Sequence, residues 1–156
     1  MYKKIFIALL SVLLLVGCTK KIKQDDGIER MYLDNQYYNK GNFIGVKAND
    51  LLDKVDDTYI LFTYNNYCSL PISCEEIFKD FAKKYRIDFL TIPFGEFKET
   101  EFYNTVKYAP SVLIIKNNEI VAYLDAESDD DLNKYQDEKE FESWMDKYIY
   151  FNKKEK

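Results

Sequence analysis

Two cysteines of this 156-residue chain lie at a point in the sequence where a thiol can become reactive. Cys68 and Cys74 lie between a strand-like apolar run, Thr58 to Tyr64, and a helix-like run, Glu75 to Tyr85. A cysteine at such a strand-to-helix turn can sit at the helix N-terminus, where unpaired N–H groups and the helix dipole favour a thiolate over a thiol. Because the thiolate is the reactive form, this segment is a candidate redox site.

The chain contains no histidine, which excludes several reaction classes. Ser–His and Cys–His catalysis need an imidazole as base, and His-ligated zinc sites need one as ligand. The acidic run Asp125 to Asp131 lacks the alternating ligands and the turn glycine of an EF-hand, so we interpret it as a solvated loop. We therefore expect neither a metal ion nor another cofactor.

Two local geometries for the cysteine pair are open at the level of sequence. If the helix begins at Ser69, the α-carbons of Cys68 and Cys74 lie at least ~9 Å apart, beyond the ~7 Å that a disulfide tolerates. If Ser73 is instead the N-cap, with Glu76 completing a capping box, the preceding residues form a loop that can bring the two sulfurs together.

The remaining pattern predicts alternating strands and helices. Apolar runs and helical periodicity place strands at 43–46, 58–64, 87–94, 111–115 and 119–124, and helices at 50–55, 75–85, 100–108 and 139–150. A strand–helix–strand unit implies a parallel crossover, whereas Asn117-Asn118 is typical of a tight antiparallel hairpin. We therefore expect an α/β fold with a mixed central sheet.

The stretch from about Phe43 to Tyr150 resembles a thioredoxin-fold domain in its layout. Tyr67 takes the place of the aromatic residue that precedes the first active-site cysteine, and Ala109-Pro110-Ser111 resembles the family's cis-proline segment. The active-site motif departs from the family, because C-S-L-P-I-S-C stands where thioredoxins carry C-x-x-C. The resemblance implies a three-layer α/β/α sandwich around a mixed sheet.

Two functions follow from this resemblance. As an enzyme, the protein would attack a partner disulfide with Cys68 and resolve the mixed disulfide with Cys74, while Tyr67, Ala109 and cis-Pro110 would line the substrate groove. As a binding or accessory module, for example in peptide export, it would keep the fold and the groove and use the cysteines only as a structural disulfide, or form none. Both functions have exported proteins or peptides as partners, and the enzyme would also need a membrane redox partner.

The first residues predict a lipoprotein signal peptide rather than part of the fold. A short basic start precedes the apolar run Ile5 to Val16, which is too short to cross a bilayer, and Leu15-Val-Gly-Cys18 resembles a lipobox. An ordinary cleaved signal or an uncleaved anchor is the alternative. We expect a signal peptide over 1–17, an acylated Cys18 with a tether over 18–42, a domain over 43–151 and a disordered tail over 152–156.

Export would place the domain on the extracytoplasmic face of the cell membrane, held there by palmitate-type acyl chains on Cys18. Loss of residues 1–17 removes two lysines and moves the formal charge from −5 to −7. An acidic domain with scattered lysines lacks the basic patch of a nucleic-acid-binding protein, so no nucleic acid is expected as a partner.

Substituting Cys18 tests the predicted anchor. Cys18→Ala should leave an unprocessed or released protein that carries no lipid label, because the acylated side chain is removed. Fractionation and metabolic lipid labelling provide the measurement. A variant that fractionates and labels like the parent chain would show the lipoprotein interpretation to be wrong.

Overall fold

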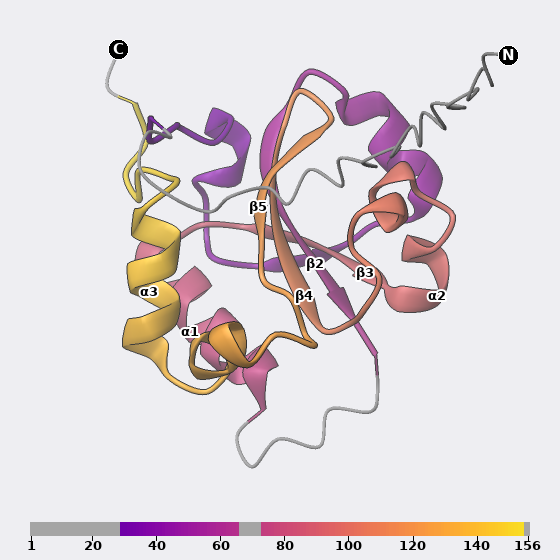
Figure 1. The fold of residues 1–156 in the computed structure, drawn as a ribbon. Coiled ribbons are helices and arrows are strands. Elements are labelled where there is room, and N and C mark those ends of the chain that lie inside the picture. Colours follow the sequence, from indigo (N-terminus) through magenta and orange to yellow (C-terminus); the bar gives the residue numbers. More distant parts are fainter. Residues whose placement is uncertain (1–28, 66–72, 155–156) are drawn as a thin grey trace, which may run out of the picture.

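The computed structural model describes residues 29–65 and 73–154, and these form a five-stranded mixed sheet with helices on both faces (Figure 1). The strand order is β1-β3-β2-β4-β5, which confirms the expected three-layer α/β/α sandwich. The strands are β1 (Phe43–Gly45), β2 (Thr58–Tyr64), β3 (Phe89–Pro93), β4 (Ser111–Lys116) and β5 (Glu119–Tyr123).

The central strand β2 is buried on both faces because its sequence is a continuous apolar run. It pairs in parallel with β3, where Leu61 faces Leu90, and antiparallel with β4, where Leu61 faces Leu113. The β4–β5 hairpin turns through Asn117 and Asn118, whose φ angles are 50° and 61°. These positive values confirm the hairpin turn expected from the two asparagines.

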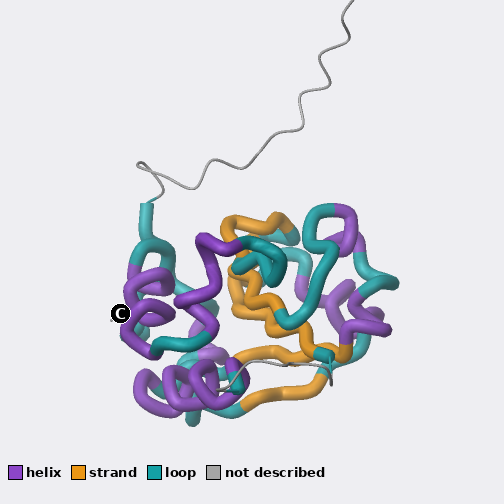
Figure 2. The backbone as a smooth tube through the Cα atoms, turned by 60° about the horizontal axis from the view of Figure 1, so that its bottom comes forward, coloured by secondary structure: helices purple, strands orange, loops and turns teal. Residues whose placement is uncertain are grey.

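The two longest helices, α1 (Cys74–Tyr85) and α3 (Glu138–Asp146), cover one face of the sheet. The opposite face carries shorter segments: η2 (Ala48–Lys54), α2 (Phe94–Phe97) and η3 (Glu101–Asn104). In Figure 2 the strands run between these two groups of helical segments. The remaining 3₁₀ segments are η1 (Asn35–Tyr37) and η4 (Asp129–Tyr135).

The prediction of one helix over 100–108 is wrong, because the helical residues lie earlier and form two shorter segments. The chain forms α2 and then the single turn η3, and the Thr100 hydroxyl donates a 2.8 Å hydrogen bond to the Phe97 carbonyl. Threonine side chains that bond to nearby carbonyls compete with regular helix. The helix expected over 50–55 is also a 3₁₀ segment, η2.

The last helix ends at Asp146 instead of Tyr150 because the N-terminal segment pairs with the residues that follow it. Met31 donates its N–H to the Tyr148 carbonyl at 2.8 Å and accepts the Tyr150 N–H at 2.9 Å. Leu33 and Tyr37 are buried in the core. The packed unit therefore begins before the Phe43 boundary that the sequence pattern predicts.

A buried carboxylate fixes the loop that connects this segment to β1. Asp88 lies at the start of β3 and accepts hydrogen bonds from the backbone N–H groups of Lys40 and Asn42 at 3.2 and 2.7 Å. Between them, Gly41 has φ 75°, and a Cβ there would lie 2.3 Å from the carbonyl oxygen of Ala82 in α1. Only glycine fits this close approach of loop and helix.

No helix within residues 29–65 and 73–154 combines the length and the apolar character needed to cross a membrane.

Removing the hydroxyl group should have opposite effects on the free energy of unfolding at two buried tyrosines. The Tyr37 hydroxyl donates to Asp57 at 2.8 Å, whereas the Tyr59 hydroxyl finds no partner among the described residues. Tyr37→Phe should lower the stability by roughly 1–3 kcal/mol, and Tyr59→Phe should leave it unchanged or raise it by up to about 1 kcal/mol. Urea denaturation measures both, and equal losses in the two variants would contradict this assignment.

The raised pKa values of the same two tyrosines lead us to expect a loss of stability at high pH. Burial raises the pKa of both hydroxyls above the ordinary tyrosine value. Above a pH of about 10 the unfolded chain releases protons that the folded chain retains, so the free energy of unfolding falls as the pH rises. Tyr59→Phe should weaken this alkaline fall, and urea denaturation between pH 8 and roughly pH 11 would measure the change.

Candidate functional site

The candidate site lies at the end of the sheet where β2 ends and β4 begins. The Ala109–Pro110 peptide bond immediately before β4 is cis, as expected from the resemblance. Two side chains hold the residues around it: Ser111 Oγ donates to the Tyr108 carbonyl at 2.8 Å, and Asn65 Nδ2 donates to the Ala109 carbonyl at 2.9 Å. The loop is thus fixed from both neighbouring strands.

A third side chain, Tyr135 of η4, completes this clamp. Its buried hydroxyl donates to the Pro110 carbonyl at 2.9 Å. Burial raises the pKa of Tyr135 well above its ordinary value, the neighbouring Ser111 side chain lowers it in part, and the negative charge of Asp131 raises it further. The hydroxyl therefore stays protonated at neutral pH and remains a donor to the loop. Three successive carbonyls, those of residues 108–110, are each held by a different side chain.

Cys74 is the first residue of α1 and is only 2% exposed. Ser73 is the N-cap, in agreement with the second of the two geometries left open by the sequence. The expected capping box is wrong, because the Ser73 side chain makes no capping hydrogen bond and the Glu76 N–H donates to the Ser73 carbonyl at 3.0 Å. The N-terminus of α1 is therefore at Cys74.

Tyr135 connects Cys74 with the cis-proline loop. Phe78 follows Cys74 by one helical turn, and its ring centroid lies 5.9 Å from that of Tyr135. The same Tyr135 hydroxyl bonds to Pro110. The first turn of α1 and the cis-proline loop are therefore linked through Phe78 and Tyr135.

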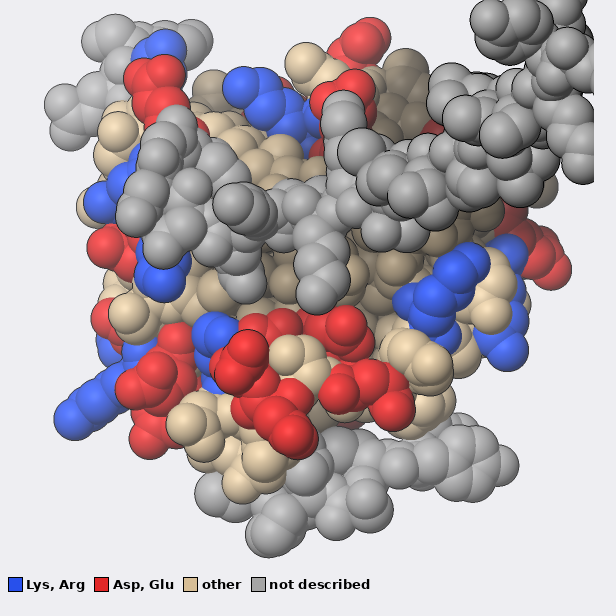
Figure 3. All heavy atoms as spheres, viewed as in Figure 1, with Lys and Arg blue, Asp and Glu red and all other residues tan. Residues whose placement is uncertain are grey.

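The charges around the described part of this site are mostly negative. Glu75 and Glu76 occupy the first turn of α1, and Lys79 forms an ion pair with Glu75 at 2.5 Å. Figure 3 shows acidic side chains gathered over η4 at the lower edge of the molecule, and the exposed members are Glu127, Asp129 and Asp130. The helix dipole favours a thiolate at Cys74, and these carboxylates oppose it.

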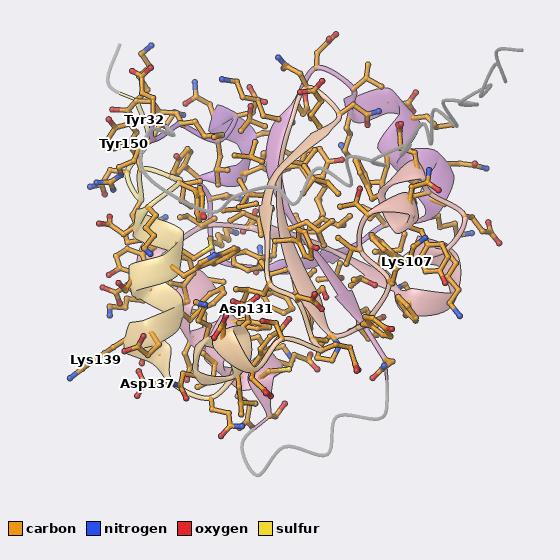
Figure 4. The ribbon with its side chains drawn as sticks, viewed as in Figure 1. Tyr32, Lys107, Asp131, Asp137, Lys139 and Tyr150 are labelled. Carbon is orange, nitrogen blue, oxygen red and sulfur yellow. The ribbon has the colours of Figure 1, made fainter. Side chains whose placement is uncertain are left out.

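The acidic run is more than a solvated loop. Asp131 is 6% exposed, accepts the Asp125 N–H at 2.8 Å and pairs with Lys134 at 2.5 Å (Figure 4). Within residues 29–65 and 73–154, no group of three or more Cys, Asp or Glu side chains is arranged to hold a metal ion. The carboxylate of Asp131 instead shapes the segment that presents Tyr135.

Several predicted residues fall outside the described part of the chain, namely Cys18, Tyr67 and Cys68. The sequence pattern does not mark Asn65 or Tyr135 as site residues. A signal for Tyr135 exists, because an aromatic residue three positions after Leu132 is unusual for a purely solvated acidic segment. No comparable signal marks Asn65, whose role depends on a partner 44 positions away.

Comparison with solved structures agrees with the fold. A mutant thioredoxin from Halobacterium salinarum NRC-1 aligns with 70% of this chain and 93% of its own, with a TM-score of 0.53 and 17% identity. The reduced thioredoxin pre-protein of Schistosoma mansoni aligns with 69% of this chain and 99% of its own, with a TM-score of 0.47 and 20% identity. No family model and no curated protein sequence matches the chain. At 17% identity, the likeness to the Halobacterium salinarum structure shows the thioredoxin-like fold alone.

The clamp on the cis-proline loop can be tested by removing one hydroxyl. Tyr135→Phe should lower the free energy of unfolding by about 1 kcal/mol or more, because the Pro110 carbonyl loses its donor. Tyr108→Phe provides a matched control on the same loop, since Tyr108 is 50% exposed and should change stability by less than about 0.5 kcal/mol. Equal effects in urea denaturation would argue against the clamp.

Proposed function

We propose that this protein is a membrane-anchored, extracytoplasmic thioredoxin-like protein that performs thiol–disulfide exchange on exported proteins or peptides. Cys68 is the attacking thiol, and Cys74 is the resolving thiol. The observation that supports the proposal is the burial of Cys74 at the first position of α1, one helical turn before Phe78, which packs against the Tyr135 that bonds to Pro110. Because the Cys74 thiol is buried, it can attack a mixed disulfide that has formed within the site, whereas a disulfide in solution cannot reach it.

The exchange runs in two steps that conserve atoms and electrons. The Cys68 thiolate attacks one sulfur of a substrate disulfide, which forms a mixed disulfide and releases the other substrate sulfur as a thiolate. The Cys74 thiolate then attacks the Cys68 sulfur, which releases the second substrate thiolate and leaves a Cys68–Cys74 disulfide. Two electrons pass from the protein to the substrate, and the reverse sequence oxidises a substrate dithiol.

The cis-proline loop would position the substrate in this scheme. Its three carbonyls are held by side chains, so the loop presents a fixed surface to an extended peptide. Tyr108 projects from this loop with half of its surface exposed and can pack against a substrate side chain. In this scheme Tyr67, Ala109 and Pro110 also contact the substrate.

The proposed anchor is an acylated Cys18. In an exported protein this leaves two thiols, an even number, in a compartment where disulfides persist. A multiply acylated cysteine holds a protein stably at a bilayer, whereas a single chain binds only marginally.

A non-catalytic binding or accessory module, for example in peptide export, is the second candidate. The negative charges of Glu75, Glu76 and η4 favour it, because they oppose a reactive thiolate near the start of α1. In this case the fixed loop and the exposed Tyr108 recognise a partner, and the cysteines form at most a structural disulfide.

Trapping of mixed disulfides distinguishes the two functions. Cys74→Ala should accumulate mixed disulfides between Cys68 and exported proteins, because the resolving thiol is missing, whereas Cys68→Ala should accumulate none. Non-reducing electrophoresis after acid quenching and alkylation measures the adducts. The reduced parent chain should also alkylate faster at Cys68 than at the buried Cys74 at mildly acidic pH.

A structural disulfide predicts a different result for the same variants. Both would lose at most about 2–3 kcal/mol of stability, and neither would capture a partner. If Cys68 alkylates no faster than Cys74 and traps nothing, the exchange function is wrong and the binding module takes its place.

A further inference from the structure

The end of the molecule opposite the cysteine site carries a cation–aromatic stack. The rings of Tyr32 and Tyr150 stack with centroids 4.4 Å apart. The Arg30 guanidinium carbon lies 4.6 Å from the centroid of Tyr150, and Lys154 Nζ lies 5.9 Å from that of Tyr32. These four residues and Lys153 line a shallow open depression, whose other lining residues are Asp146, Phe151 and Asn152. We refer to Arg30, Tyr32, Tyr150, Lys153 and Lys154 as the terminal patch.

The terminal patch differs in charge from the rest of the domain. Residues 31–146 contain 12 basic and 23 acidic side chains, a net charge of −11, whereas residues 147–154 contain three lysines and no acidic side chain. Arg30 is paired with Asp146 at 2.5 Å, and its neighbour Glu29 is exposed and negative, so the exposed Lys153 and Lys154 supply the net positive charge of the patch. The domain is thus an acidic body with one basic pole.

The described part of the chain begins at this same pole. Glu29 and Arg30 are the first described residues, and Arg30 bonds to the Ile149 carbonyl at 3.1 Å. Eleven residue steps separate Cys18 from Glu29, and they span at most about 40 Å even when fully extended. An acyl chain on Cys18 would therefore keep the terminal patch within about 40 Å of the bilayer surface.

We propose that the terminal patch docks on anionic phospholipid headgroups of the membrane to which the protein is anchored. Lysines near an anionic surface and tyrosines at the headgroup level are the side chains that favour such contact. The acidic body is repelled by the same surface, so only this pole can approach it. The inference rests on the proposed function for the distance between the terminal patch and the bilayer, which the anchor sets. The attraction of the lysines and tyrosines to anionic headgroups does not depend on the anchor.

Docking at this pole orients the cysteine site away from the lipid. Figure 4 shows Tyr32 and Tyr150 near the end of α3 and Asp131 near its beginning, so α3 separates the terminal patch from η4. The start of α1 and the cis-proline loop lie at the same end as η4. In the bilayer-docked domain, the start of α1 and the cis-proline loop therefore lie on the side away from the lipid, which exported partners can reach.

The test compares two matched pairs of lysines in the full chain carrying Cys18→Ala. Lys153→Gln with Lys154→Gln removes two charges from the terminal patch. Lys98→Gln with Lys107→Gln removes two charges elsewhere, from lysines that also lie over aromatic rings, those of Phe94 and Tyr103. The measurement is partitioning onto vesicles of pure phosphatidylcholine and onto vesicles that also contain phosphatidylglycerol. The apolar residues 5–16 bind both compositions, so the ratio of the two partition coefficients isolates the contribution of charge.

The terminal-patch pair should lower the preference for phosphatidylglycerol by roughly thirtyfold at low salt, and the control pair by less than about twofold. Salt at about 1 M should abolish the preference of the parent chain. An unchanged preference in the terminal-patch pair, or equal losses in both pairs, would overturn the proposal. If the Cys18→Ala variant still carries a lipid label, the proposal that Cys18 is the anchor is wrong. The ratio of partition coefficients would still test whether the terminal patch binds anionic lipid.

Hydrogen exchange on the full chain locates the contact. Amides of residues 30–33 and 148–152 should exchange more slowly on vesicles containing phosphatidylglycerol than on phosphatidylcholine alone, and those of η4 should not change. Slower exchange at η4 would place the acidic end at the membrane and contradict the proposed orientation.

Discussion

The packing of Phe78 is the interaction on which the arrangement of the site depends. Its ring meets Phe62 of the sheet edge-on at 5.3 Å, Phe141 of α3 at 4.5 Å and Tyr135 of η4 at 5.9 Å. One buried side chain thus fixes α1 relative to three other elements, and Cys74 lies one turn before it. Aromatic pairs of this kind add about 0.5–1.5 kcal/mol each beyond the burial of apolar surface.

The charge distribution gives the two ends of α3 different roles. Near its beginning, η4 gathers carboxylates and presents Tyr135 to the cis-proline loop, whereas beyond its end the chain carries lysines and stacked tyrosines. In the proposed functions, the acidic end binds a partner or exchanges disulfides with it, and the basic end orients the domain on the membrane. Because the charged neighbours of the site among the described residues are mostly acidic, a thiolate at Cys74 relies on the helix N-terminus for its stabilisation.

Features set by local sequence were predicted well, and features set by distant contacts were not. The continuous apolar run of β2 and the two asparagines of the hairpin determine their structures within a few residues. By contrast, α3 ends early because Met31 pairs with Tyr148 and Tyr150, more than 100 positions away. Tyr135 was missed for a similar reason, since its partner Pro110 is 25 positions distant and its neighbours are acidic.

The pairing of Met31 has a mechanical consequence. A force applied to the chain at Glu29 reaches first the bonds of Arg30 to Asp146 and Ile149, and then the two backbone hydrogen bonds of Met31. These contacts all lie at or beyond the end of α3, so the load passes into the C-terminal segment before it reaches β2 or the cis-proline loop.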